Sequence, residues 1–303
     1  MAASVLTLIA ADAKADAQPW VDEAARALDR LGAQLGAADW LAARRAVDIP
    51  FEGLDPDQAE AAVRASLKLG FDGPPVDALA QPAADRRKRL LLSDMEATVI
   101  ANEMLVEIAK FAGIEKPIAE ITRRTMNGEL DFAAALRERV ALLRGKPTTL
   151  LDQAAQRIRI AAGAKAMVAT MRKHGALTVL VSGGFTVFAH PVAERLGFDR
   201  AFANRLVTEN GAIAGVAEPV LNRDSKLATL TQTAAERGLK LVDTLAIGDG
   251  ANDLPMIGAA GLGIAFHSHP NVAPHARHRI DHADLTAALF AQGYRQDEIV
   301  GDS

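Results

Sequence analysis

Leu90-Leu91-Leu92-Ser93-Asp94-Met95-Glu96-Ala97-Thr98 places two carboxylates directly after an apolar run that reads as a buried strand. Asp94 and Glu96 are two positions apart, and side chains with that spacing on a strand share a face. Both acids can therefore point toward one spot at the end of the strand. Such a pair suits a hard cation with oxygen ligands, or a nucleophilic carboxylate beside a general acid. Taken alone, the pattern is equally compatible with solvated acids in a loop.

The composition limits the classes of function. The chain has 303 residues, half of them hydrophobic and about a quarter charged, so we expect one large or two modest domains with a sizeable core. A net charge of −4 argues against nonspecific nucleic-acid binding. The absence of cysteine excludes thiol catalysis, thiolate metal sites and disulfides. No apolar segment approaches the length of a membrane span, so a soluble, cytoplasmic protein without a membrane partner is expected.

The first part of the chain predicts a small α/β module over residues 1–70. Residues 71–89 begin with a Gly- and Pro-rich stretch and end in a basic run, and they are predicted to form a linker. The elements predicted within the module are strands at 5–9 and 44–49 and helices at 19–35 and 55–69.

From residue 90 onward, strands and helices alternate, which predicts βαβ units and a parallel sheet. The strand at 90–93 is followed by a helix at 103–111 and by a helical stretch at 117–160 without a convincing strand. These helices indicate an insertion after the first strand of the sheet. A hairpin is predicted around the turn-forming pair Asn210-Gly211. The remaining elements are predicted as strands at 178–181, 244–247 and 261–265 and helices at 185–195, 225–236 and 252–259.

Residues able to carry chemistry gather where the predicted strands end, which is where open parallel sheets bind ligands. Val181-Ser182-Gly183-Gly184 combines a hydroxyl with backbone N–H groups before a helix, an arrangement typical of anion sites. Ile247-Gly248-Asp249-Gly250-Ala251-Asn252-Asp253 holds two acids separated by small residues. Lys226, near the start of a helix, adds a cation. Carboxylates, a phosphate-binding turn and a cation are the groups that phosphoryl transfer requires.

In this order, the four segments resemble the motifs of the haloacid dehalogenase (HAD) superfamily of phosphotransferases, and within it the phosphoserine phosphatase family. The first motif, D-x-D-x-T, is matched from Asp94 to Thr98 with Glu96 in place of the second Asp. The strand-terminal Ser or Thr is matched by Ser182, the lysine by Lys226, and G-D-G-x-N-D by residues 248–253.

The resemblance runs from residue 90 to about residue 288 and implies an overall architecture. We expect an α/β fold with a HAD-like Rossmannoid parallel sheet as the core of a phosphatase domain at 90–303. A helical cap at about 103–162 is expected after the first core strand. By position and β/α pattern, the N-terminal module is interpreted as a degenerate ACT-like domain, which binds ligands or dimerises, so a homodimer is also expected.

The resemblance also implies the roles of the motif residues. Asp94 is expected to attack phosphorus and form an aspartyl-phosphate, and Glu96 to act as general acid and base. Mg²⁺ is the expected cofactor, held by Asp94, the backbone carbonyl of Glu96, and Asp249. Asp253 is expected to act through the outer coordination sphere of the metal. The groups expected to hold the phosphate are Thr98, Ser182, Gly183, Lys226 and Asn252.

At residue 96 the sequence departs from the family pattern, which most often has Asp. One methylene displaces the carboxyl group by roughly 1.5 Å, and a misplacement of about 1 Å can lower a rate on the order of 100-fold. The expected backbone contact with the metal is unaffected. Two alternatives therefore remain open: an active enzyme with Glu96 as acid and base, or a catalytically weak amino-acid or phosphate sensor.

The resemblance places substrate choice in the helical insertion. Phe132 and Arg139 are two helical turns apart and share a face, and Glu103 lies nine residues beyond the nucleophile. In phosphoserine phosphatases the matching arginine binds the substrate carboxylate, the phenylalanine closes the pocket and the glutamate receives the ammonium; Met126 is also placed alike. These charges would recognise O-phospho-L-serine, the last intermediate of L-serine biosynthesis. Another small phosphorylated metabolite remains the alternative substrate.

One cluster lies outside the motifs. Five of the seven histidines fall between His267 and His282. Their spacing fits no common zinc-ligand pattern, so a zinc site is not favoured there. The expected partner of the chain is a small molecule, without nucleic acid.

Overall fold

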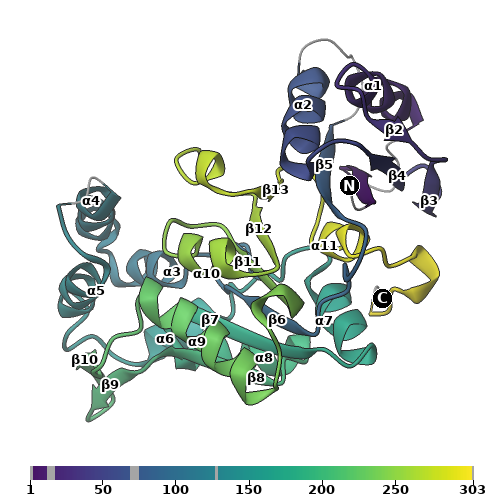
Figure 1. Ribbon diagram of the computed structural model, residues 1–303. Helices are drawn as coiled ribbons and strands as arrows, with labels where there is room; N and C mark the ends of the chain where they lie inside the picture. Colours follow the sequence, from purple (N-terminus) through teal and green to yellow (C-terminus); the bar gives the residue numbers. More distant parts are fainter. Residues whose placement is uncertain (1–2, 12–17, 69–74, 127–128, 302–303) are drawn as a thin grey trace.

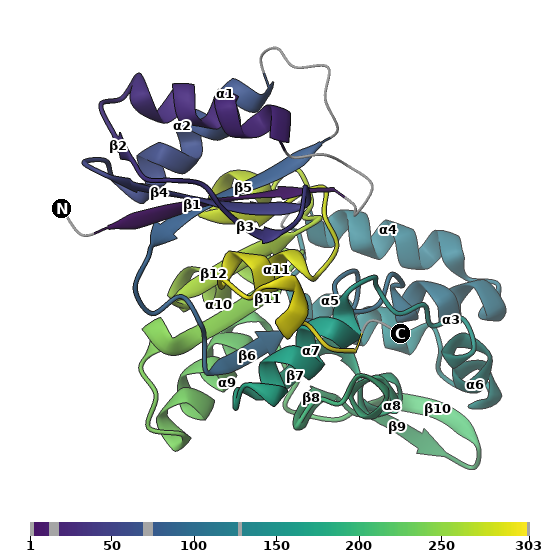
Figure 2. The same ribbon diagram turned by 90° about the vertical axis from the view of Figure 1, so that its right-hand side faces the viewer.

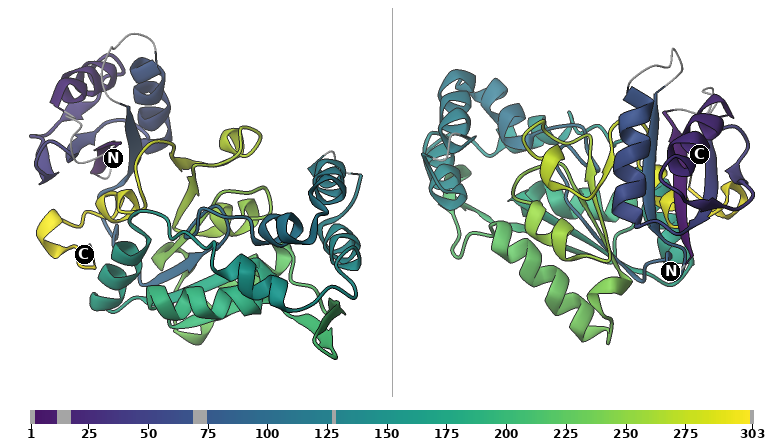
Figure 3. Two further views of the ribbon diagram at one scale, coloured as in Figure 1. Left: turned by 180° about the vertical axis from the view of Figure 1, so that it is seen from behind. Right: turned by 45° about the horizontal axis from the view of Figure 1, so that its top comes forward.

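The computed structural model describes residues 3–11, 18–68, 75–126 and 129–301 (Figure 1). A module from the N-terminal part of the chain lies at one end of a larger α/β core. Helices α4 (Glu115–Met126) and α5 (Phe132–Ala141) protrude at the opposite end, as the views in Figure 3 also show. None of the described helices is long and apolar enough to cross a bilayer.

Six strands form the core sheet, in the order β13 (His278–Ile280), β12 (Leu262–Phe266), β11 (Thr244–Gly248), β6 (Leu90–Ser93), β7 (Leu177–Phe185) and β8 (Arg200–Asn204). Every neighbouring pair is parallel. In chain order, the first strand of the core sheet is the central strand β6. Strands β7 and β8 follow on one side of it, and β11 to β13 follow on the other. Ligands bind beyond the carboxyl ends of a parallel sheet at such a reversal. The topology therefore places a site at the ends of β6, β7 and β11.

Helices cover both faces of this sheet: α7 (Ala164–Lys173) and α8 (Thr186–Leu196) on one, α9 (Arg223–Glu236) and α10 (Leu254–Ala259) on the other. Leu91 and Leu180 pack with the first pair, whereas Leu90 and Leu92 pack with the second. Alternation along the strands thus buries apolar side chains on both faces. The predicted parallel α/β core is confirmed.

The N-terminal module contains β1 (Ser4–Ala10), α1 (Gln18–Asp29), β2 (Gln34–Leu35), β3 (Asp39–Ala42), β4 (Ala46–Glu52), α2 (Pro56–Lys68) and β5 (Val76–Pro82). Its sheet is antiparallel, in the order β2-β4-β1-β5 with β3 also on β4, which is a ferredoxin-like arrangement. Figure 2 shows α1 and α2 together on one face. On the other face, Ile9 and Leu79 join the apolar cluster that contains α11 (Ala287–Ala291).

Two predictions for this part of the chain are wrong. The helix predicted at 19–35 ends at Asp29, and Gln34–Leu35 forms β2. Residues 76–82 of the predicted linker form β5, which pairs with β1 along its length. Ala and Asp are weak strand formers, so local sequence did not indicate this strand; burial in the sheet decides it. Residues 71–74 of the predicted linker lie outside the described residues.

The predicted helical insertion is present but divided. It consists of α3 (Met104–Ala112), α4, α5 and α6 (Thr149–Ala155), so the stretch at 117–160 is three helices rather than one. We call α3 to α6 the cap. The predicted hairpin is confirmed as β9 (Leu206–Glu209) and β10 (Ala212–Val216). Asn210 and Gly211 both have positive φ, as a tight hairpin turn requires. Three 3₁₀ turns complete the described elements: η1 (Leu241–Asp243), η2 (Ala273–His275) and η3 (Gln296–Glu298).

A polar seam joins the N-terminal module to the core. The buried carboxylate of Asp77 accepts hydrogen bonds from the backbone N–H groups of residues 281–283 at 2.7, 3.2 and 2.8 Å. The Nδ1 atom of His278 lies 2.7 Å from a carboxylate oxygen of Glu60, and both side chains are buried. Buried polar groups require such partners. His278, one of the five clustered histidines, therefore helps to join the N-terminal module to the core.

Packing between β12 and α10 leaves no room for a side chain at Gly263. A Cβ atom there would lie 1.9 Å from the carbonyl oxygen of Ile257. We expect Gly263→Ala to lower the free energy of unfolding by about 3 kcal/mol, because the helix backbone must shift. Urea denaturation measures this change. Gly258→Ala, which meets open space on α10, is the control and should not destabilise; equal stability of both variants would contradict this packing.

Candidate active site

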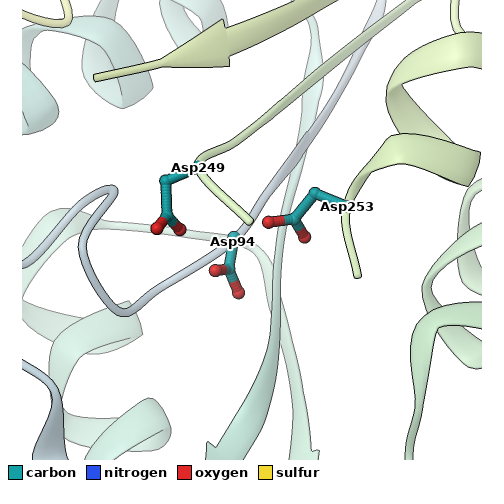
Figure 4. Close-up of side chains that lie close together, drawn as sticks. All are labelled: Asp94, Asp249 and Asp253. Carbon is teal, nitrogen blue, oxygen red and sulfur yellow. The ribbon is translucent and has the colours of Figure 1, made fainter. Parts of the chain in front are cut away.

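Three carboxylates meet at the ends of adjacent core strands (Figure 4). Asp94 follows β6, whereas Asp249 and Asp253 follow β11, and one oxygen of each lies within 4.8 Å of the others. The N–H of Asp94 donates to the carbonyl of Ile247 at 2.9 Å, which ties the two strand ends together. Across the described ranges, this is the one cluster of His, Asp or Glu side chains arranged to hold a metal ion. The histidine-rich segment forms no second one there.

Lys226 is the cation nearest to this cluster. Its buried Nζ lies 2.7 Å from Asp94 Oδ1 and 2.6 Å from Asp253 Oδ1. Burial alone lowers the pKa of Lys226, but these two carboxylates outweigh it and hold the pKa above its usual range. Burial, and then repulsion by Asp253, raises the pKa of Asp94 well above its usual value and that of Asp249 to about 7. One ammonium thus faces three carboxylates.

This excess of acidic oxygens fits a hard divalent cation such as Mg²⁺. A cation among the carboxylates would favour their ionised forms and offset the burial and repulsion that raise their pKa values. Thr98 is buried, and its hydroxyl donates to Asp249 Oδ1 at 3.4 Å. This hydrogen bond orients a carboxylate of the cluster. The motif resemblance had predicted instead that Thr98 helps to bind the phosphate.

The loop after β11 depends on its glycines. The N–H of Gly250 donates to Asp253 Oδ2 at 3.0 Å. A Cβ at Gly248 would lie 2.4 Å from Asp253 Cγ, and one at Gly250 would lie 2.3 Å from Asn252 Oδ1. Asp253 and Asn252 are thus folded back over the backbone. Larger residues at these glycines would displace both side chains.

The segment at the end of β7 is held in place by Asn204, a residue outside the sequence motifs. The Nδ2 atom of Asn204 donates to the carbonyl of Gly183 at 2.8 Å, and its Oδ1 accepts from the N–H of Leu221 at 2.7 Å. Asn204 is buried at the end of β8. Ser182 Oγ accepts from the N–H of Gly184 at 2.9 Å. The sequence signal that could have identified Asn204 was an amide side chain at the end of a strand next to β7.

Glu96 extends from the end of β6 toward the cap. Its Oε1 accepts the N–H of Met104, the first residue of α3, at 2.8 Å. Burial raises the pKa of Glu96 to about 7, while the Met104 hydrogen bond opposes the shift. A carboxyl group with such a pKa has both protonation states populated near neutral pH, as a general acid and base needs.

The cap places the predicted substrate residues around Glu96. The ring of Phe132 lies over Gly183, because a Cβ on Gly183 would be 2.6 Å from Phe132 Cζ. Burial lowers the pKa of Arg139, and the charges of Glu96 and Glu103 oppose this shift. Arg139 Nε donates to the carbonyl of Ala135 at 3.2 Å. The described part of the chain offers its guanidinium no carboxylate within ion-pair distance.

The other two predicted substrate residues lie at helix ends. Glu103 precedes α3 and is exposed, and partial desolvation beneath the cap, followed by repulsion from Glu96, raises the pKa of its carboxyl group above the usual value. Met126 is the last residue of α4, and its side chain lies outside the described part. The structure therefore brings Glu103, Phe132 and Arg139 to the same side of the core as the carboxylates.

Comparison with known proteins now decides the family. Residues 91–258 match the model of the haloacid dehalogenase-like hydrolases. The chain belongs to this family. The predicted HAD-like fold is thereby confirmed, and so is the resemblance from which its motif roles were inferred.

This haloacid dehalogenase-like hydrolase is similar to proteins named phosphoserine phosphatase. One from Lactococcus lactis is 41% identical over 203 residues, covering 67% of this chain and 94% of that relative. Phosphoserine phosphatase SerB2 of Mycobacterium tuberculosis is 36% identical over 267 residues, covering 83% of this chain but only 64% of the relative, slightly less than two thirds of its length. A solved structure of a probable phosphoserine phosphatase from Vibrio cholerae superposes with a TM-score of 0.75 at 27% identity, covering 98% of this chain and 88% of that one.

Removal of one charge from the cluster tests its metal-binding role. We expect Asp249→Asn to weaken Mg²⁺ binding by at least about 10-fold, because a charged oxygen donor is lost. Isothermal titration calorimetry with MgCl₂ measures the affinity. Asp224→Asn, an exposed acid on α9, is the matched control and should bind Mg²⁺ like the natural chain. Unchanged affinity in Asp249→Asn would contradict the assignment.

Proposed function

We propose that this hydrolase is a Mg²⁺-dependent phosphatase that converts O-phospho-L-serine to L-serine and phosphate. One observation carries the proposal: the Asp94 carboxylate, held by Lys226 in an acidic cluster, lies beneath a cap that presents Arg139 and Glu103. The relatives named phosphoserine phosphatase support the choice of substrate.

Asp94 is the proposed nucleophile. Its buried carboxylate is oriented by the ammonium of Lys226 at 2.7 Å and anchored by its N–H to β11. In the first step, a carboxylate oxygen of Asp94 forms a bond to phosphorus while the bond from phosphorus to the serine oxygen breaks. An aspartyl-phosphate on Asp94 and free serine result.

Glu96 is the proposed acid and base. In its protonated form it donates a proton to the departing serine oxygen. It then accepts a proton from a water molecule that attacks phosphorus, the bond from phosphorus to Asp94 breaks, and phosphate is released. The pKa of about 7 allows the same carboxyl group to serve in both steps.

The phosphoryl group needs positive charge and hydrogen-bond donors around it. Ser182, the N–H of Gly183 and Lys226 supply these at the ends of β7 and α9, and we propose Asn252 as a further donor. Asp94, Asp249 and the carbonyl of Glu96 would hold Mg²⁺, which neutralises phosphoryl oxygens when bound.

The cap supports recognition of an amino-acid zwitterion. Arg139 is a half-buried guanidinium without a carboxylate partner in the described chain, so it can bind a substrate carboxylate. Glu103 offers a carboxylate for the substrate ammonium, and the ring of Phe132 closes over the phosphate-binding turn. A neutral phosphate ester would use neither charge.

The alternatives are less well supported. A sensor without turnover would follow from a misplaced Glu96, but this carboxyl group has a defined hydrogen-bond partner at the site. Another small phosphorylated substrate would leave the opposite charges of Glu103 and Arg139 unused. A homodimer and a ligand of the N-terminal module remain predictions, supported by its ferredoxin-like arrangement.

Release of phosphate from O-phospho-L-serine tests the proposed function directly. We expect release by the purified chain in the presence of Mg²⁺, loss of release with EDTA, and recovery when excess Mg²⁺ is restored, because the acidic cluster needs a cation. A colorimetric phosphate assay measures this. Absence of Mg²⁺-dependent release would contradict the proposal.

Substitution of Arg139 tests the choice of substrate. We expect Arg139→Ala to raise KM for O-phospho-L-serine roughly 10- to 100-fold, because a charge-assisted contact with the carboxylate is lost. The KM for p-nitrophenyl phosphate, which has no carboxylate, should change little. Arg137→Ala, an exposed arginine of the same helix paired with Glu218, is the control. An equal rise for both substrates would contradict recognition of the zwitterion.

A further inference from the structure

The Glu96 carboxylate lies between the first residue of α3 and the open space beside Gly184. One carboxylate oxygen accepts the N–H of Met104 at the start of α3, 2.8 Å away. The other faces Gly184 in the turn after Ser182. The side chain thus connects the first core strand, the first cap helix and the phosphate-binding turn. A shorter aspartate would extend less far toward either group.

Gly184 leaves the space that this carboxylate occupies. A Cβ atom at position 184 would lie 2.8 Å from Glu96 Oε2 and 3.1 Å from its Cδ. Such contacts are closer than carbon and oxygen tolerate, so one group must move. The backbone of Gly184 is not in the left-handed region, and alanine is therefore permitted by its dihedral angles. The group that yields is the end of the Glu96 side chain.

We propose that Gly184 is a positioning residue that makes glutamate at position 96 compatible with catalysis. The absence of a side chain at 184 lets the Glu96 carboxylate settle against the Met104 N–H, which fixes it over the site. This inference rests on the proposed function, because it concerns the acid and base of that reaction. It explains how the chain accommodates the longer acid in its first motif.

Gly184→Ala would affect Ser182 as well as Glu96, and the two effects must be distinguished. The same Cβ would lie 3.1 Å from Ser182 Oγ, so Gly184→Ala also crowds a proposed phosphate ligand. Crowding of Ser182 does not depend on residue 96. Displacement of the acid does, because aspartate is shorter by one methylene and withdraws from position 184. The residue at 96 therefore distinguishes the two effects.

The experiment is a double-mutant cycle of Gly184→Ala and Glu96→Asp, with kcat and KM measured for O-phospho-L-serine at saturating Mg²⁺. In the glutamate background, Gly184→Ala should lower kcat on the order of 100-fold, as expected for a catalytic group moved by about 1 Å. Glu96→Asp alone supplies the second background of the cycle, and its own kcat is the reference for the double variant. Added to Glu96→Asp, Gly184→Ala should lower kcat by less than about threefold.

Gly258→Ala serves as the matched glycine control, since its Cβ meets open space, and it should leave kcat unchanged. Thermal melts establish that every variant is folded. An equal loss of kcat from Gly184→Ala in both backgrounds would assign the effect to Ser182 and overturn the proposal. So would the absence of any loss. No activity in the natural chain would instead refute the proposed function.

Removal of the hydrogen bond from the Met104 N–H to Glu96 tests the positioning of Glu96 independently. Glu103 has φ −100° and ψ 105°, an extended conformation that suits a residue before proline, and proline is tolerated at the first position of a helix. Met104→Pro removes the N–H, whereas Met104→Ala removes the buried side chain and keeps the N–H. We expect kcat to be at least about 10-fold lower in the proline variant than in the alanine variant. Equal kcat values would show that this N–H does not position Glu96 and would overturn that part of the inference.

Discussion

A single buried ammonium among three carboxylates is the constraint on which the site depends. Lys226 bridges Asp94 and Asp253 from a helix far away in the sequence, and it is the reason that these acids can be buried together. Even so, one positive charge does not balance three negative ones, and burial together with repulsion by Asp253 raises the pKa values of Asp94 and Asp249. The cluster therefore suits a hard cation, whose charge would balance the excess of carboxylates.

Glu96 connects this preorganised core with the cap. In a sheet whose strand ends carry the reactive groups, the cap must bring substrate-binding residues to them without disturbing the carboxylates. The hydrogen bond from Met104 to Glu96 joins the two parts at the proposed acid, and the ring of Phe132 lies over Gly183.

The sequence predicted the core well because its signals are local. The strand that ends just before Asp94 and the Asn210-Gly211 hairpin each have a pattern readable within a few residues, and both are confirmed. The strand β5 was missed because its alanines have little strand preference, and pairing with β1 decides its conformation. Asn204 was missed for a related reason: its partners, the Gly183 carbonyl and the Leu221 N–H, belong to distant segments.

The sequence by itself determined the motifs, their order and hence the family, because the reactive groups follow apolar strands at fixed short spacings. It also showed that residue 96 is a glutamate and left the consequence open. Only the tertiary structure decided where that carboxylate lies, since the Met104 N–H and Gly184 come from the cap and from the second core strand. A side chain three bonds long can reach several positions, and packing of distant segments selects one of them.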